Sequence, residues 1–243
     1  VSSVITKPAG CVTDGLCTHN CTICGHVWTE VIPAEHFYAD GACTVCGQSM
    51  ILEGTCGDSV RWRYDGAKRS LNIGGIGAMY DYADESVPWQ DVADIVQEIV
   101  INDGVTYIGV TAFYAMTDVH SVSIPESVTE IGDNAFGYCS GLKEIQLPEK
   151  LETLGEGAFA YCHRLEDIII PASVTQIGIG AFQGCGNLSG IWVEERNVFS
   201  SSDSHGALFD RGQRNLLQVP AAMDGTYTLP YTVLSIGEFA LEG

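Results

Sequence analysis

Basic side chains are scarce in this chain of 243 residues, where 11 Lys and Arg stand against 31 Asp and Glu for a formal net charge of −20. Nucleic acids and anionic membrane surfaces are bound mainly through Lys and Arg. The charge balance therefore argues against both as partners. It is typical of a soluble protein that works outside the cell.

Long apolar segments are also lacking, because no stretch approaches the roughly 18 residues that a membrane span requires. We therefore expect no membrane insertion. The chain has neither an initiator Met nor a basic start followed by an apolar run, so we expect the mature or trimmed form of a secreted protein.

Signatures of enzymes are missing as well. The sequence contains no G-x-S-x-G pattern and no P-loop, and it has no D-x-D-x-D-G loop for calcium. We predict that the chain is not an enzyme.

What the chain does contain is a repeat with a period of 23 residues, which several columns of residues share. The phenylalanines of the repeat are Phe113, Phe136, Phe159 and Phe182. The glycines are Gly109, Gly132, Gly155 and Gly178, and the cysteines are Cys139, Cys162 and Cys185. A regular period of this kind is the signature of a solenoid.

A single copy of the repeat, residues 122–144, shows how each coil is built. Val122 and Ile124 alternate as the inward residues of a short strand, which Pro125 ends. Gly132 suits a tight bend. The spacing of the next inward residues is that of one helical turn: Ala135, Phe136 and Cys139. We predict a leucine-rich-repeat solenoid of short parallel strands and short helical turns, with buried free thiols in its core.

The repeated pattern I-x-I-P-x-x-V-T-x-I-G-x-x-A-F-x-x-C-x-x-L resembles the BspA-like leucine-rich repeat family of bacterial surface proteins. The likeness runs from about residue 56 to the end of the chain. It implies a secreted or cell-surface location and a role in adhesion to, or recognition of, an extracellular host protein or glycan. It supplies no catalytic residues. A structural spacer in a larger surface protein is the alternative.

These patterns divide the chain into three parts. We predict a Cys-rich module at 1–56, an N-terminal cap at 57–98, and leucine-rich repeats at 99–243 with an irregular, hairpin-containing repeat at 191–228. The repeat stops without a visible cap, so we expect the natural chain to continue beyond residue 243. The cap carries a basic cluster, which is read as a solvated strand face in preference to an anion site: Arg61, Arg63, Lys68 and Arg69.

The Cys-rich module contains two C-x-x-C-G units separated by 18 residues, a spacing that suits a tetrahedral zinc site. The four predicted ligands of this structural zinc are Cys21, Cys24, Cys43 and Cys46. Disulfides are the rival interpretation, since secretion favours them. The residues left without a role are Cys11, Cys17, Cys56, His19, His26 and His36. Either Cys17 and His19 join a second metal site, or the histidines lie on the surface and two of the remaining cysteines form one pair.

The outward residues of successive strands should align in a column that offers a ligand-binding surface. This predicted column consists of Val100, Ser123, Gln146, Ile169 and Trp192. An acidic edge accompanies it, formed by Glu98, Ser121, Glu144 and Asp167. An outward Trp is typical of binding hot spots. The alternative is that Trp192 packs beneath the inserted hairpin.

Overall fold

The computed structural model describes residues 2–7, 15–24, 26–32, 38–39, 42–43, 48–82, 86–223 and 225–242. They form two compact units. The smaller comprises Val1–Ile51 and Asp65–Lys68, and the larger comprises Leu52–Tyr64 and Arg69–Gly243.

The smaller unit contains a three-stranded antiparallel sheet in the order β1-β2-β3. Its strands are β1 (Ser2–Lys7), β2 (Gly15–Asn20) and β3 (Val27–Ile32). A second, shorter antiparallel pair consists of β4 (Tyr38–Ala39) and β5 (Ala42–Cys43). The first C-x-x-C unit lies in the turn between β2 and β3, and the second begins at the end of β5.

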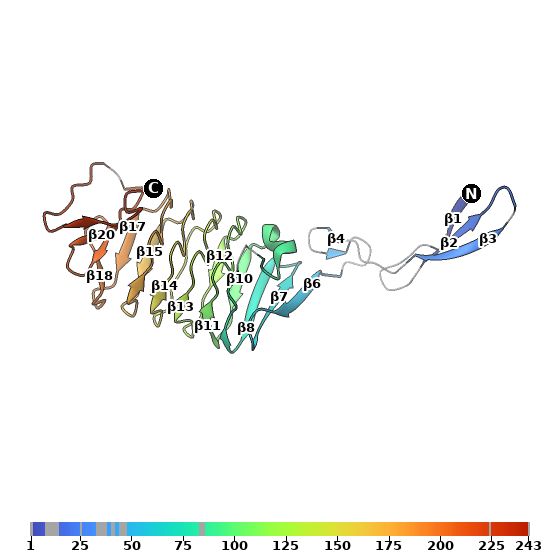
Figure 1. Ribbon diagram of the computed structural model, residues 1–243, viewed down its shortest axis with the longest axis horizontal. Coiled ribbons are helices and arrows are strands. Elements are labelled where there is room, and N and C mark those ends of the chain that lie inside the picture. The colour runs from blue at the N-terminus through green and yellow to red at the C-terminus, as the bar shows by residue number, and fades with distance from the viewer. Residues whose placement is uncertain are drawn as a thin grey trace. The chain divides into compact units, whose positions relative to one another are not determined.

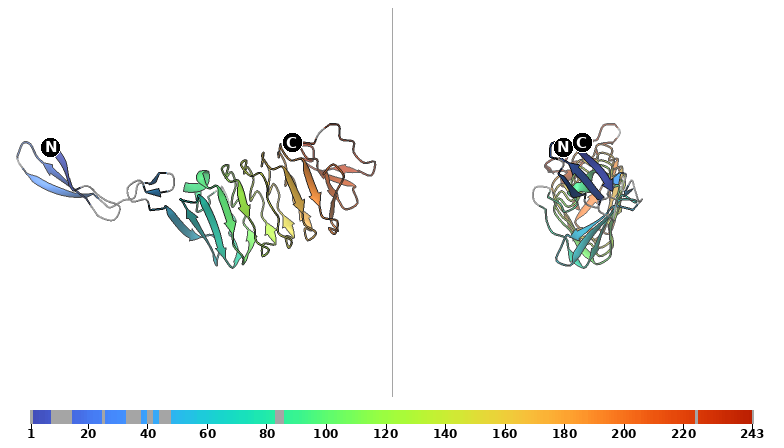
Figure 2. Two further views of the ribbon diagram at one scale, coloured as in Figure 1. Left: turned by 180° about the vertical axis from the view of Figure 1, so that it is seen from behind. Right: turned by 90° about the vertical axis from the view of Figure 1, so that its right-hand side faces the viewer.

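The larger unit is a solenoid whose coils stack side by side, as Figures 1 and 2 show. Its first sheet has the order β12-β10-β8-β7-β6, in which β10 runs parallel to both β8 and β12. The strands are β6 (Ile51–Thr55), β7 (Val60–Asp65), β8 (Ser70–Gly75), β10 (Glu98–Ile101) and β12 (Ser121–Ser123). Val60, Trp62 and Tyr64 of β7 are buried while Arg61 and Arg63 are exposed, as their alternation predicts. The sheet therefore continues without a break from the cap into the repeats.

A second parallel sheet forms on the return leg of each coil, in the order β16-β14-β13-β11-β9. Its strands are β9 (Gly77–Ala78), β11 (Val105–Ile108), β13 (Glu130–Ile131), β14 (Thr153–Leu154) and β16 (Gln176–Ile177). The pairing joins equivalent residues of neighbouring coils, such as Ile131 with Leu154. The 23-residue period is thus the length of one coil.

The repeat glycines are required by close packing between coils, and not by a tight bend as the sequence suggested. A Cβ at Gly155 would lie 2.5 Å from the backbone nitrogen of Asp133, and one at Gly178 would lie 2.3 Å from that of Glu156. Neither glycine has a positive φ. A side chain at these positions would push neighbouring coils apart.

The Ala-Phe-x-x-Cys leg is a series of turns instead of the helical turn that its spacing indicated. The amide of Phe136 donates to the carbonyl of Ala158 in the next coil at 2.9 Å, and Phe159 donates likewise to Ala181 at 2.8 Å. Positive φ angles at Asn134 and Tyr138 interrupt any helix. Because these amides bond between coils, this leg provides a third ladder that holds the stack together. Within the described residues, the 3₁₀ segment η2 (Gln90–Ile95) of the cap is the helical element.

The repeat phenylalanines form a continuous buried stack. The ring centroids of Phe113, Phe136, Phe159 and Phe182 are 5.2, 5.4 and 6.0 Å apart in succession, and Trp89 of the cap stacks on Phe113 at 5.6 Å. Each of these rings is almost wholly buried. The cap therefore closes the hydrophobic core with an aromatic ring at the position of a repeat phenylalanine.

The repeat cysteines are buried free thiols, as predicted. The Sγ of Cys139 donates to the carbonyl of Phe113 at 3.1 Å, and Cys162 and Cys185 make the equivalent bonds one and two coils later. Burial raises the pKa of Cys139 and of Cys185 to about 12. These cysteines are therefore structural.

The irregular coil follows β17 (Gly190–Val193), which pairs in parallel with β15 (Asp167–Ile170). The next sheet has the order β18-β19-β20-β21. Its strands are β18 (Ser200–Ser202), β19 (Leu208–Asp210), β20 (Asn215–Gln218) and β21 (Ser235–Ile236). The predicted hairpin around Arg211 is the antiparallel β19–β20 pair, and β21 then resumes parallel pairing with β20.

Candidate functional site

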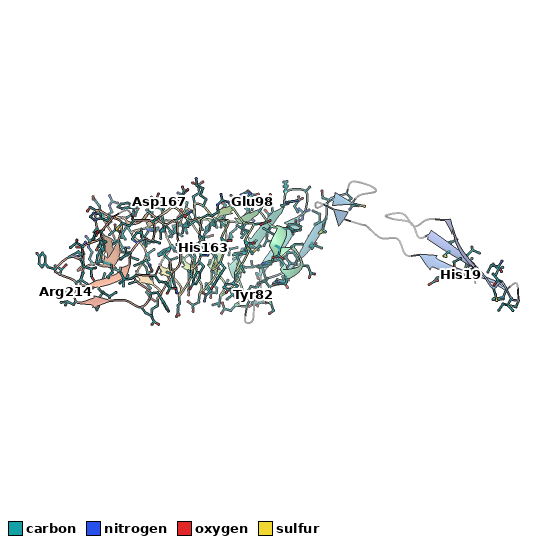
Figure 3. The ribbon with its side chains drawn as sticks, turned by 90° about the horizontal axis from the view of Figure 1, so that it is seen from above. His19, Tyr82, Glu98, His163, Asp167 and Arg214 are labelled. Atoms are coloured by element: carbon teal, nitrogen blue, oxygen red, sulfur yellow. The ribbon has the colours of Figure 1, made fainter. Side chains whose placement is uncertain are left out.

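The outward side chains of the first-leg strands form two parallel rows on one face of the solenoid. We call the row that contains Val100, Ser123, Gln146, Ile169 and Trp192 the binding row. The acidic row consists of Glu98, Ser121, Glu144, Asp167 and Gly190. Strand pairing places Val100 beside Ser123, and Ile169 beside Trp192. Glu98 and Asp167 lie along the same edge of the solenoid in Figure 3.

The middle of this face is hollowed. A depression of about 600 Å³ is lined in part by Ser121, Glu144 and Gln146, and a smaller one of about 240 Å³ by Ser123 and Gln146 among others. Gln146 lines both depressions and shares the smaller one with Ser123, so the two residues lie near each other although residues 144–146 form no regular strand. The structure therefore places the five predicted residues along one surface.

The two rows carry three carboxylates and neither Lys nor Arg. Glu144 and Asp167 are exposed, and Glu98 is half-buried. The nearest ammonium group in sequence, Lys143, pairs with Glu166 at 3.3 Å. The face therefore has an excess of negative charge along its acidic row.

Trp192 lies across its own strand. A Cβ at Gly190 would come within 2.5 Å of the indole, so the ring occupies the space above a residue that has no side chain. Its Nε1 donates a long hydrogen bond of 3.4 Å to Oδ1 of Asp167, and Ser189 Oγ donates to the same oxygen at 2.8 Å. These contacts hold the indole against the sheet.

The ring nevertheless remains accessible. Trp192 is 39% exposed and Ile169 beside it is 60% exposed, so the two form an apolar patch bordered by polar groups. The inserted segment lies against the same strand, because the amide of Ile191 donates to the carbonyl of Gly206 at 2.9 Å and Ser202 Oγ accepts a hydrogen bond from the amide of Val193 at 3.1 Å. This packing leaves the exposed part of Trp192 accessible.

A second groove lies at the cap end of the solenoid. It has a volume of about 620 Å³, and its lining includes Arg61, Arg63, Asn72 and Asn102. Both arginines are exposed, in line with a solvated strand face. The groove itself was not foreseen from the sequence. Gly54, Gly74 and Gly75 also line it.

The described cysteines of the smaller unit show how its two C-x-x-C units begin. The amide of Cys21 donates to the carbonyl of His26 at 2.8 Å, and that of Cys43 donates to Gln48 at 2.8 Å. Both bonds link a first cysteine to the residue five positions later. Cys46 lies outside the described residues.

The thiol of Cys21 is surrounded by hydrogen-bond donors. The backbone amides of Cys24 and then Ile23 lower the pKa of Cys21, because they stabilise its thiolate. Cys17, Cys21 and Cys24 carry free thiols. In the described part of the chain, no three His, Cys, Asp or Glu side chains gather closely enough to hold a metal ion.

The residues left unassigned by the sequence have separate surroundings. His19 contacts Ser3 Oγ through Nδ1 at 2.8 Å and Glu30 through Nε2 at 3.1 Å, which engages both ring nitrogens. Cys56 is buried in the solenoid unit, where burial raises its pKa to about 12. His26 is exposed. Cys11 and His36 lie outside the described residues.

Stacked parallel coils, ladders of equivalent residues and an exposed strand face define a leucine-rich-repeat solenoid. Residues 93–204 match the family model described as BspA type leucine rich repeat region, in six copies. The chain thus carries a leucine-rich repeat region of the BspA type. In the described residues, no helix is both long and apolar enough to cross a membrane.

Solved structures share this fold. A leucine-rich repeat protein from Eubacterium ventriosum is 25% identical with a TM-score of 0.65, and the match covers 79% of this chain and 57% of that one. The pneumococcal vaccine antigen PcpA is 17% identical with a TM-score of 0.50, over 79% of this chain and 61% of its own. The present chain thus spans less than two thirds of either relative. A comparison with curated proteins finds no match.

Proposed function

We propose that this chain is a non-enzymatic recognition module of a secreted or cell-surface bacterial protein, and that it binds a host protein or glycan through the binding row and the acidic row. The BspA-type repeats support the location and the class of function. The observation that carries the proposal is the accessible indole of Trp192, held against the sheet by Asp167 and Gly190. A ring fixed before binding loses little conformational entropy on contact with a partner.

The test is an array of host extracellular proteins and glycans, probed with the purified chain and with Trp192→Ala. Tyr231→Ala is the matched control, because Tyr231 is a fully exposed aromatic residue outside both rows. We expect the wild-type chain and the control to bind the same ligands, and Trp192→Ala to lose most of that binding. If the wild-type chain binds no ligand on the array, the result would favour the alternative, a structural spacer.

We also propose that Cys21, Cys24, Cys43 and Cys46 hold a structural zinc ion in the smaller unit. The equivalent bonds of Cys21 to His26 and of Cys43 to Gln48 support this proposal, as do the amides around the Cys21 thiol. The sequence of this unit has few large apolar residues, so bound zinc would supply stability that a small core does not, with a contribution on the order of 10 kcal/mol.

Elemental analysis of the purified chain tests the zinc proposal. We expect about one zinc per chain, lost in Cys24→Ser and retained in Cys17→Ser. Disulfides would give a different result, in which zinc is absent and the thiols of the smaller unit resist alkylation until a reductant is added. That result would overturn the proposal.

A further inference from the structure

The patch around Trp192 joins an exposed aromatic face to an unbalanced carboxylate. Asp167 lies beside the indole through the 3.4 Å hydrogen bond from Nε1, and it also accepts the hydroxyl of Ser189. Both hydrogen bonds come from neutral donors, so they leave the negative charge of Asp167 uncompensated. Glu144 adds a second exposed carboxylate one coil away in the same row.

The two rows contain no Lys or Arg that would balance the charges of Asp167 and Glu144. Lys143 is already paired with Glu166. His120 lines the same depression as Glu144. An incoming cation would therefore gain attraction from both carboxylates without displacing an existing ion pair.

The indole adds a second attraction for a cation. The face of a Trp ring carries the negative end of its quadrupole and attracts Lys or Arg that lies above it. Trp192 lies over Gly190, is 39% exposed and meets Asp167 at its Nε1, so one guanidinium group could stack on the exposed part of the ring and donate hydrogen bonds to the carboxylate. Ile169 would contact the methylene groups of the same side chain.

Resting on the proposed function, we infer that this patch binds an Arg-containing basic segment of a partner protein, with Arg preferred to Lys. Arginine is preferred because its planar fork can stack and pair with a carboxylate at the same time. The net charge of −20 would speed the approach of such a partner. The patch therefore favours binding of a cationic protein surface and disfavours sulfated or sialylated glycans, which are negatively charged.

The probe is the peptide acetyl-Gly-Arg-Gly-Arg-Gly-amide, with the corresponding Lys peptide beside it. Binding of each peptide is followed through the indole N–H resonance of Trp192 in the NMR spectrum of the whole chain. We expect that resonance to shift, the Arg peptide to bind more tightly than the Lys peptide, and both affinities to fall as salt rises.

Matched variants separate the local site from overall charge. Asp167→Asn and Asp118→Asn remove the same charge, but Asp118 is exposed and lies outside both rows. We expect Asp167→Asn to lower the affinity for the Arg peptide about fivefold or more and Asp118→Asn to leave that affinity nearly unchanged. Trp192→Phe should keep part of the affinity and Trp192→Leu should lose it, since Leu is apolar but has no aromatic face.

Three outcomes would overturn the inference. Equal losses in the two Asp variants would mean that only net charge matters. Equal affinities of the Phe and Leu variants would mean that Trp192 is merely an apolar contact. Binding of neutral oligosaccharides at this patch, insensitive to salt, would assign it to sugars. In the last two cases the array of host ligands would still respond to Trp192→Ala, so the proposed function would survive.

Discussion

The ring of Phe136 lies parallel to the ring of Phe159, with an interplanar angle of 1° and 5.4 Å between the centroids. Phe159 contacts Phe182 in the same way on its other side, at 6.0 Å and 2°. A ring in the middle of this stack therefore has aromatic neighbours in both adjacent coils.

Phe159→Ala should lower the free energy of unfolding by roughly 3–5 kcal/mol, because it removes a buried ring and leaves a cavity between two coils. Urea denaturation measures this loss. Phe199→Ala is the matched control, since Phe199 is 53% exposed and should lose less than about 1 kcal/mol. A loss below about 1 kcal/mol for Phe159→Ala would show that the stack does not carry the core.

Gly155→Ala should destabilise the solenoid by about 1–3 kcal/mol, because the added methyl group would lie 2.5 Å from backbone atoms of the preceding coil. Backbone atoms cannot turn aside as a flexible side chain can. Gly186→Ala is the control, since a Cβ there meets nothing within 4 Å. Urea denaturation measures the free energy of unfolding of both variants. Equal values for Gly155→Ala and Gly186→Ala would contradict the close-packing role of Gly155.

Asn197→Ala should lower stability by more than about 2 kcal/mol, since a buried amide would be lost with all its hydrogen bonds. Its Nδ2 donates to the carbonyls of Pro171 and Val174, and its Oδ1 accepts the amides of Phe199 and Ser200. Asn187→Ala, on the surface, is the control and should change little. A near-neutral Asn197→Ala in thermal or urea unfolding would mean that water replaces the amide.

Stability should fall as the pH rises above about 9. Burial raises the pKa of Cys139 and Cys185 from 9.0 to about 12, so between these values the folded chain binds more protons than the unfolded chain. The stabilising contribution of the neutral thiols is complete below pH 9 and is lost as pH rises toward 12. Raised tyrosine pKa values, such as that of Tyr82, act in the same direction.

Urea midpoints measured between pH 7.5 and 10.5 would test this dependence. Cys139→Ala should flatten the decline, since it removes one of the titrating groups. A midpoint that stays constant or rises over this interval would contradict the buried-thiol account. In the same native samples, iodoacetamide should spare the buried Cys139 and modify it only after urea has unfolded the chain.

Part of the candidate site could be predicted and part could not. The step of 23 residues places Ile169 and Trp192 side by side, and the pairing of β15 with β17 confirms it. The direction of the Trp192 side chain was beyond prediction. It depends on the absence of a side chain at Gly190 and on a hydrogen bond to Asp167 in the neighbouring coil.

The sequence by itself determined the length of a coil, the buried columns and the two outward rows. It could do so because inward and outward positions follow directly from a repeated pattern of apolar and polar residues. Only the tertiary structure decided why the glycines are needed, why the Ala-Phe-x-x-Cys leg forms turns, and how the groove beside Arg61 is shaped. Each of these depends on contacts between coils, where the backbone of one turn meets the next, and a linear pattern does not record such contacts.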